Sequence, residues 1–174
     1  MKNIEKYLSL LSENQGLLLT SRYSRYYAAE FDIAEGVAIV TAKGSRYFTD
    51  SRYIESAQNG IRGMEVVQVG KGYGYMQLLN QAIEDFGIEK LGYEEYYLTV
   101  GEFQGYEKGL SCALEPMQKR INAFRAVKEP WEIELMKKAQ EITDKAFSEI
   151  VQRVHPGMTE KELAAELIYC LYKN

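Results

Sequence analysis

Short apolar runs alternate with amphipathic stretches over the first 120 residues, and this alternation is what most constrains the fold. Residues 37–42 and 45–49 are two such runs, and Lys43 and Gly44 between them are typical of a hairpin turn. Residues 75–86 carry apolar side chains at helical spacing, and Gly87 follows as a C-terminal stop. The pattern predicts an α/β fold, a mixed β-sheet with helices on both faces. The expected strands are residues 16–20, 37–42, 45–49, 64–69, 90–94 and 112–117, and the expected helices are residues 3–14, 50–58, 75–86 and 100–108.

The pattern changes at Pro130, which is pre-organised for the first position of a helix. A long apolar stripe at helical spacing follows, until His-Pro-Gly at residues 155–157 ends it. Thr159 and Glu162 then form a capping box at the start of another helix. No strand accompanies these two helices. We therefore expect one domain over residues 1–122, a linker over residues 123–129, and part of a second domain over residues 130–174.

Composition argues against several classes of partner. The 25 acidic and 21 basic residues give a net charge of −4. Because binding to nucleic acid or to an anionic membrane surface needs clustered Lys and Arg, we expect neither partner. No apolar run approaches the roughly 20 residues that span a bilayer, and residues 1–6 lack the apolar core of a signal peptide. Cys112 and Cys170 have no CxxC spacing and no nearby His, which fits free thiols in a reducing cytoplasm.

Three local features could carry chemistry, and for each we favour a structural interpretation. His155, the one histidine, stands beside a Pro-Gly turn with no paired carboxylate at ligand spacing, so we expect a loop residue. Asp50 at a strand end is expected to cap the following helix or to pair with Arg52. The glycines of residues 70–74 match neither the dinucleotide nor the P-loop spacing, so we expect a strand-to-helix turn.

Several segments, in this order, resemble one family. These segments are residues 47–53 (Tyr-Phe-Thr-Asp-Ser-Arg-Tyr), 124–133 (Phe-Arg-Ala-Val-Lys-Glu-Pro-Trp-Glu-Ile) and 156–163 (Pro-Gly-Met-Thr-Glu-Lys-Glu-Leu). They resemble the creatinase/prolidase/Xaa-Pro aminopeptidase family of M24 metallopeptidases. Residues 21–36 resemble that family's loop after the first strand, usually Asn-x-x-Tyr-Leu-Thr-Gly-Phe. Ser24, Tyr27 and Phe31 occupy its first, fourth and last positions, whereas Ala29 and Glu30 replace its Thr-Gly pair, and glycine permits backbone angles that glutamate disfavours.

The resemblance implies a ribonuclease-H-like N-terminal domain, followed by a pita-bread catalytic domain that holds two divalent metal ions, manganese or cobalt. The parent protein would hydrolyse short proline-containing peptides at Xaa-Pro bonds, as an aminopeptidase or as a dipeptidase. Its metal ligands would come after Asn174. We therefore expect no catalytic residue and no metal ligand in this chain, an inactive chain, and two helices of an incomplete pita-bread domain at its end.

The resemblance also suggests a role for the aromatic and basic residues. In such proteins the N-terminal domain of one subunit often lines the active site of its neighbour. Guanidinium and phenol groups suit the carboxylate end of a peptide. We therefore predict that the chain forms a homo-oligomer, most simply a dimer, and restricts the site to short peptides. The predicted substrate-binding residues, acting in trans, are Tyr27, Phe31, Arg52 and Tyr53; the alternative is that they form a domain surface or subunit interface.

Two other functions remain open at this point. Some relatives have lost the metal site and act as non-catalytic peptide- or protein-binding modules. A stand-alone magnesium-dependent nuclease would instead use Asp50 with the acidic residues Glu30, Asp32 and Glu35. The acidic net charge disfavours the nuclease.

Overall fold

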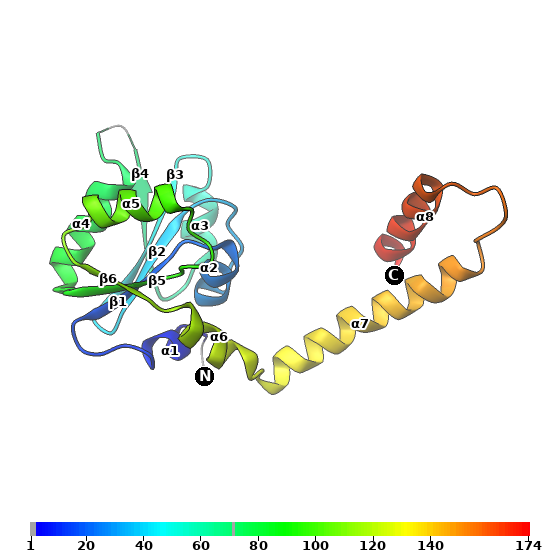
Figure 1. Ribbon diagram of the computed structural model, residues 1–174, viewed down its shortest axis with the longest axis horizontal. Coiled ribbons are helices and arrows are strands. Elements are labelled where there is room, and N and C mark those ends of the chain that lie inside the picture. The colour runs from blue at the N-terminus through cyan, green and yellow to red at the C-terminus, as the bar shows by residue number, and fades with distance from the viewer. Residues whose placement is uncertain (1–2, 71) are drawn as a thin grey trace. The chain divides into compact units, whose positions relative to one another are not determined.

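The computed structural model describes residues 3–70 and 72–174, and the chain divides into two compact units, Met1–Arg125 and Ala126–Asn174. The first unit is built on a six-stranded sheet in the order β4-β3-β2-β1-β5-β6 (Figure 1). β2 runs antiparallel to β1 and β3, and the other neighbouring pairs are parallel. The predicted mixed sheet and its hairpin are confirmed. The strands are β1 Gln15–Leu19, β2 Val37–Thr41, β3 Gly44–Asp50, β4 Glu65–Val69, β5 Lys90–Tyr93 and β6 Ala113–Pro116.

Helices cover both faces of the sheet, as predicted. Successive strand residues point to opposite faces, so Leu17 and Leu19 belong to one buried cluster and Leu18 to the other. Helices α1, α2, α3 and α6 contribute to the first cluster, whereas α4 and the residue after α5 contribute to the second. These helices are α1 Asn3–Leu8, α2 Arg22–Ala29, α3 Ile54–Gly60, α4 Tyr75–Phe86, α5 Val100–Gly109 and α6 Gln118–Ala126.

The structure departs from the predicted elements at several helices. Residues 22–29, expected to lie in a loop, form α2, whose N-cap Ser21 accepts a hydrogen bond from the Ser24 backbone N–H at 3.1 Å. Helix α3 begins at Ile54 with Tyr53 as N-cap, so neither Asp50 nor Ser51 caps it. Helix α1 ends at Leu8, before residue 14, and α6 had no predicted counterpart. The turn at residues 70–74 includes Lys71, which lies outside the described residues.

Glu30 forms a left-handed turn at the position where the resemblance has glycine. It is the C-cap of α2 and has a left-handed backbone, with φ of 53°. A residue with a Cβ loses roughly 1–2 kcal/mol in that conformation. Its Oε1 accepts a hydrogen bond from the Asn3 backbone N–H at 3.2 Å, which offsets part of this cost. The replacement therefore keeps the turn.

The second unit consists of α7 Pro130–Val151 and α8 Glu160–Lys173, which pack on each other through Ala146, Ile150 and Cys170 (Figure 1). The predicted capping box is present: the Thr159 backbone N–H donates to Glu162 Oε2 at 2.8 Å, and Thr159 Oγ1 accepts from the Glu162 N–H at 3.3 Å.

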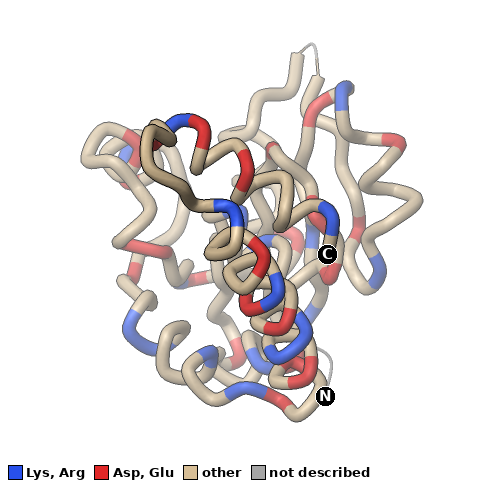
Figure 2. Tube along the Cα trace, turned by 90° about the vertical axis from the view of Figure 1, so that its right-hand side faces the viewer, with Lys and Arg blue, Asp and Glu red and all other residues tan. Residues whose placement is uncertain are grey.

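Charges of both signs are interspersed along the chain (Figure 2). Within residues 3–70 and 72–174, none of the helices combines the length and apolar character that a bilayer crossing requires.

We predict that Thr159→Ala destabilises α8 by roughly 0.5–2 kcal/mol, because it removes the oxygen that satisfies the Glu162 N–H. Faster amide hydrogen exchange over residues 161–167 would report the loss. Thr143→Ala is the control, since Thr143 Oγ1 only donates to a carbonyl inside α7. Equal exchange in Thr159→Ala and wild type would contradict the assigned cap.

Candidate functional site

Polar side chains gather at one edge of the sheet. β1, β3, β4, β5 and β6 share one direction, so their carboxyl ends meet at the same edge, where the antiparallel β2 begins. In open α/β sheets, ligands bind in the crevice outside this edge. Its described parts include Thr20 and Ser21 after β1, Asp50 at the end of β3, and Glu94 after β5.

Arg25 of α2 is buried at this edge, with 5% of its surface exposed. Its Nε donates to the Thr20 carbonyl at 3.2 Å, and its Nη1 donates to the Tyr47 hydroxyl at 2.6 Å. Its Nη1 and Nη2 also donate to the carbonyls of Ile33 and Ala34, at 3.2 Å and 3.1 Å. Burial raises the pKa of Tyr47, so its hydroxyl stays neutral and accepts this bond. One guanidinium therefore ties α2 to β1, β3 and the segment before β2.

Glu94 is a second buried charged residue at this edge. Its carboxylate is fully buried and accepts from the backbone N–H groups of Thr20 and Ser21, at 2.8 Å and 3.0 Å. Ser21 Oγ donates to it as well, at 2.7 Å. The Thr20–Ser21 peptide group thus donates its N–H to Glu94 and accepts at its carbonyl from Arg25. Buried ions are tolerated only when paired and hydrogen-bonded, and this peptide group links the two.

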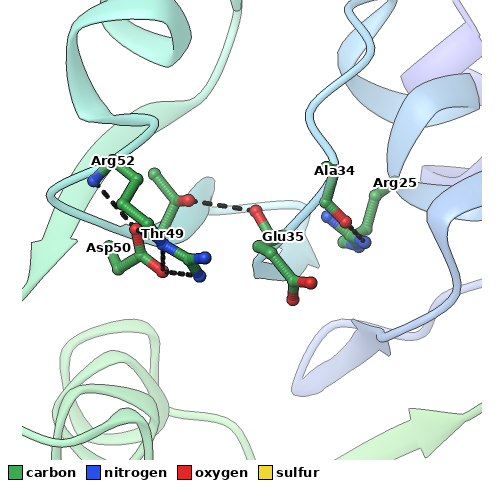
Figure 3. Close-up of polar contacts among 6 residues, drawn as sticks. All are labelled: Arg25, Ala34, Glu35, Thr49, Asp50 and Arg52. Carbon is green, nitrogen blue, oxygen red and sulfur yellow. Dashed lines mark hydrogen bonds and ion pairs between the residues drawn. The ribbon is translucent and has the colours of Figure 1, made fainter.

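Residues 33–36, which we call the 33–36 loop, are held from two sides (Figure 3). Arg25 binds the first two carbonyls, and the fully buried Thr49 donates its hydroxyl to the Glu35 carbonyl at 3.0 Å. Gly36 has φ of 142°, and a Cβ there would lie 2.6 Å from the Phe48 carbonyl oxygen. The loop is therefore fixed, whereas the Glu35 side chain is exposed.

Arg52 projects from the same edge and is oriented by Asp50. Its Nε and Nη2 donate to the Asp50 carboxylate at 3.1 Å and 2.7 Å, and its backbone N–H donates to Oδ1 at 2.9 Å. This confirms the predicted Asp50–Arg52 pair. The hydrogen bonds from Arg52 lower the pKa of Asp50, so the pair is charged at neutral pH. The guanidinium also lies over the Tyr53 ring, 5.2 Å from its centre.

The Asp50 contact leaves one edge of the Arg52 guanidinium available. Nε and Nη2 form the side edge of the guanidinium, whereas Nη1 and the remaining Nη2 hydrogen form its end edge. Within the described part of the chain, Nη1 donates to no protein group. An end edge of this kind matches a second carboxylate in the two-bonded geometry that arginine favours. Asp50 and Tyr53 hold it in place before any ligand arrives.

The structure brings together three of the four predicted substrate-binding residues. Phe31 and Arg52 line one hollow of about 490 Å³, and Tyr53 lies under Arg52. A Cβ at Gly60 would lie 2.4 Å from the Phe31 ring, so that glycine makes room for the ring. The hollow is lined by Phe31, Arg52, Glu55, Ser56, Asn59 and Gly60.

Tyr27 lies in a different environment. Its ring contacts those of Tyr7 and Phe124, with centres 5.9 Å and 6.1 Å away, and the Arg125 guanidinium lies 5.1 Å from its centre. Its hydroxyl accepts from Lys6 Nζ at 3.1 Å. These contacts join α2 to α1 and α6, so Tyr27 packs among helices of the first unit.

The roles of Arg25, Glu94 and Tyr75 at this edge were not predicted from sequence. Tyr75, the first residue of α4, is half-buried, and burial followed by the nearby Asp50 and Glu35 carboxylates raises its pKa. A signal was present for Glu94, an acid directly after an apolar strand. Its partners lie 73 and 74 residues away, beyond any local pattern.

The described residues do not form a metal site of the expected family type. Among residues 3–70 and 72–174, no three or more His, Cys, Asp or Glu side chains are grouped to hold an ion. His155 is exposed between α7 and α8, where its Nδ1 lies 3.1 Å from the Pro156 carbonyl oxygen. These described residues therefore do not by themselves make up the two-metal centre that the resemblance implies.

Comparison with known families gives two consecutive matches. Residues 4–127 match the Creatinase/Prolidase N-terminal domain, and residues 134–174 match Metallopeptidase family M24. The boundary between the two matches falls close to the division between the two compact units.

Individual relatives also match the chain over most of its length. The chain is 31% identical to the uncharacterized peptidase YqhT of Bacillus subtilis, over 87% of this chain and 43% of that protein. It is also 31% identical to a putative Xaa-Pro aminopeptidase of Mycoplasma pneumoniae, over 89% of this chain and 43% of that protein. Among solved structures, an Xaa-Pro dipeptidase from Bacillus anthracis superposes with a TM-score of 0.89 at 31% identity, over 99% of this chain and 49% of that one. The chain spans about half the length of the curated relatives it matches.

We predict that Gly36→Ala destabilises the first unit by about 2–5 kcal/mol, since it adds both backbone strain and a clash with the Phe48 carbonyl. The matched control is Gly63→Ala, because Gly63 also has positive φ, at 80°, but a Cβ there would meet no atom within 4 Å. That control should lose only the backbone strain, roughly 1–2 kcal/mol. Urea unfolding followed at amide resonances of β2 and β3 would measure the loss in free energy of unfolding for both variants. Equal losses would show that Gly36 is not needed for the fixed loop.

Proposed function

Because the chain belongs to the creatinase/prolidase N-terminal domain family, we propose that it is the part of an Xaa-Pro metallopeptidase that shapes the substrate site. The complete protein would hydrolyse short proline-containing peptides, as an aminopeptidase or a dipeptidase. In this proposal residues 1–122 form the N-terminal domain, residues 123–129 the linker, and residues 130–174 the start of a pita-bread domain. The divalent metals, manganese or cobalt, would be held by residues outside this chain, which alone would show no hydrolysis.

The observation that carries this proposal is the orientation of Arg52. Its side edge is occupied by Asp50, its face lies over Tyr53, and its end edge is available. Ordering a free arginine side chain on binding costs roughly 0.5–1.5 kcal/mol, and the two contacts remove most of that cost in advance. A peptide carboxylate is the group that such an edge recognises. We propose that Arg52, with Phe31 and Tyr53, binds the carboxylate end of a peptide for the active site of a neighbouring subunit.

Tyr27 has a different part in this proposal. Its ring is packed between α1 and α6, with Tyr7 and Phe124. We propose that Tyr27 fixes the position of α2, and through it Arg25, and so supports the site from behind.

A non-catalytic peptide-binding module remains the second candidate. The same Arg52 edge favours it, since recognition of a peptide carboxylate does not require cleavage. We also propose a cytoplasmic location, because Cys112 and Cys170 are free thiols.

The Arg52 assignment predicts selective binding of a free carboxylate. N-acetyl-Ala-Pro titrated into the ¹⁵N-labelled chain should shift the Arg52 Nε and backbone resonances saturably, whereas N-acetyl-Ala-Pro-amide should not. Arg52→Gln should abolish the shift because glutamine cannot present a charged double donor. Arg62→Gln is the control, since Arg62 only contacts the carbonyls of Gln58 and Ile61. Equal binding of the acid and the amide would refute the assignment.

The second unit supports the proposal of a homo-oligomer. α7 and α8 bury only Ala146, Ile150 and Cys170 among their described residues, so most of the apolar stripe that follows Pro130 is exposed. Leaving large apolar side chains in water forfeits roughly 1.5–3 kcal/mol each. In a longer protein the rest of the catalytic domain would cover them; for this chain we propose a second copy. The exposed large apolar residues here are Trp131, Ile133, Leu135, Met136, Ile142, Phe147, Val151, Val154, Leu167, Ile168, Tyr169, Leu171 and Tyr172.

We predict that the chain sediments as a dimer at tens of micromolar and that Leu135→Glu shifts it to monomer, because a charge enters the proposed contact. Ser148→Glu adds the same charge at an exposed polar position of α7 and should leave the dimer intact. A monomeric wild-type chain, or equal dissociation by both variants, would rule out this interface.

A further inference from the structure

Two opposite charges at the carboxyl edge are held near each other without pairing. The exposed Glu35 carboxylate has no hydrogen-bond or ion-pair partner among the residues that the structure describes. Arg52 is paired with Asp50, and its end edge has no protein acceptor within that same part of the chain. Figure 3 shows the two side chains on the same edge, with no hydrogen bond or ion pair drawn between them.

The backbone under both side chains is rigidly connected. Thr49 donates to the Glu35 carbonyl at 3.0 Å, and Asp50, the next residue, holds Arg52. On the other side, Arg25 binds the carbonyl of Ala34, the residue before Glu35. Neither charge can approach the other by a movement of the backbone without breaking these bonds. The backbone positions from which the two charged side chains extend are therefore fixed by the fold.

A carboxylate and a guanidinium arranged in this way can bind a ligand that carries one positive and one negative charge. We propose that Glu35 determines specificity by binding the free ammonium group of a short peptide whose carboxylate is bound by Arg52. This inference rests on the proposed role of Arg52. It narrows the ligand class from any peptide with a free carboxylate to short zwitterionic peptides.

The scale of the effect follows from the exposure of Glu35. A solvent-exposed ion pair contributes about 0.2–1 kcal/mol, which corresponds to a factor of up to about fivefold in binding. The ammonium contact should therefore adjust selectivity, and the carboxylate contact with its two bonds should supply more of the affinity.

The test compares two probes on one set of variants by ¹H–¹⁵N titration of the 174-residue chain. The probes are the zwitterion Ala-Pro and the anion N-acetyl-Ala-Pro. Glu35→Gln should weaken Ala-Pro binding by about threefold and leave N-acetyl-Ala-Pro unchanged, because only the former has an ammonium group. Glu13→Gln removes an exposed carboxylate just before β1, at the opposite end of that strand, and should change neither probe.

The outcomes distinguish the proposed role of Glu35 from the proposed role of Arg52. If Glu35→Gln leaves Ala-Pro binding unchanged while Arg52→Gln abolishes it, the Glu35 inference is overturned and the Arg52 role stands. If Glu35→Gln weakens both probes equally, Glu35 acts on the structure of the site and the ammonium contact is refuted. If Arg52→Gln leaves both probes bound, or if neither probe gives a saturable shift at tens of millimolar, the proposed function and this inference both fall.

Discussion

The buried Arg25–Glu94 arrangement is the interaction on which the carboxyl edge depends. Both side chains are nearly or fully excluded from water, and the Thr20–Ser21 peptide group bonds to both of them. Leaving a buried charged group without its hydrogen-bond partners typically costs more than about 1–3 kcal/mol, and each of these two groups has several. Apolar packing could join the same elements, but only directed hydrogen bonds can fix the carbonyls of the 33–36 loop.

This buried network connects the core to the surface site. Arg25 fixes the carbonyls of Ile33 and Ala34, and Thr49 fixes that of Glu35, so the loop cannot drift relative to β3. Asp50 then orients Arg52 from the end of the same strand. The site thus has exposed charges on a fixed backbone. That combination favours recognition, since little ordering remains to be done when a ligand binds.

Local periodicity was enough to predict most of the fold. Residues 75–86 form a helix with Gly87 in the left-handed conformation as its cap, as their spacing indicates. Helix α2 was missed because its buried face is made of Ser24, Arg25, Ala28 and Ala29, which give no apolar stripe. The Asp50–Arg52 pair is local and was predicted, whereas the contacts of Glu94 and Thr49 join distant segments. The predicted site residues were chosen by residue type, and this criterion could not separate Tyr27, which packs between helices, from Phe31, which lines a hollow.

The most direct test of this account is the mobility of the 33–36 loop in Arg25→Lys. Lysine keeps the charge but has one ammonium group, which cannot reach the Thr20, Ile33 and Ala34 carbonyls and the Tyr47 hydroxyl together. We expect ¹⁵N order parameters of the loop to be about 0.85 in wild type and to fall below about 0.6 in Arg25→Lys, with β2 and β3 still rigid. Unchanged order parameters in the 33–36 loop of that variant would contradict the claim that the buried guanidinium holds the site.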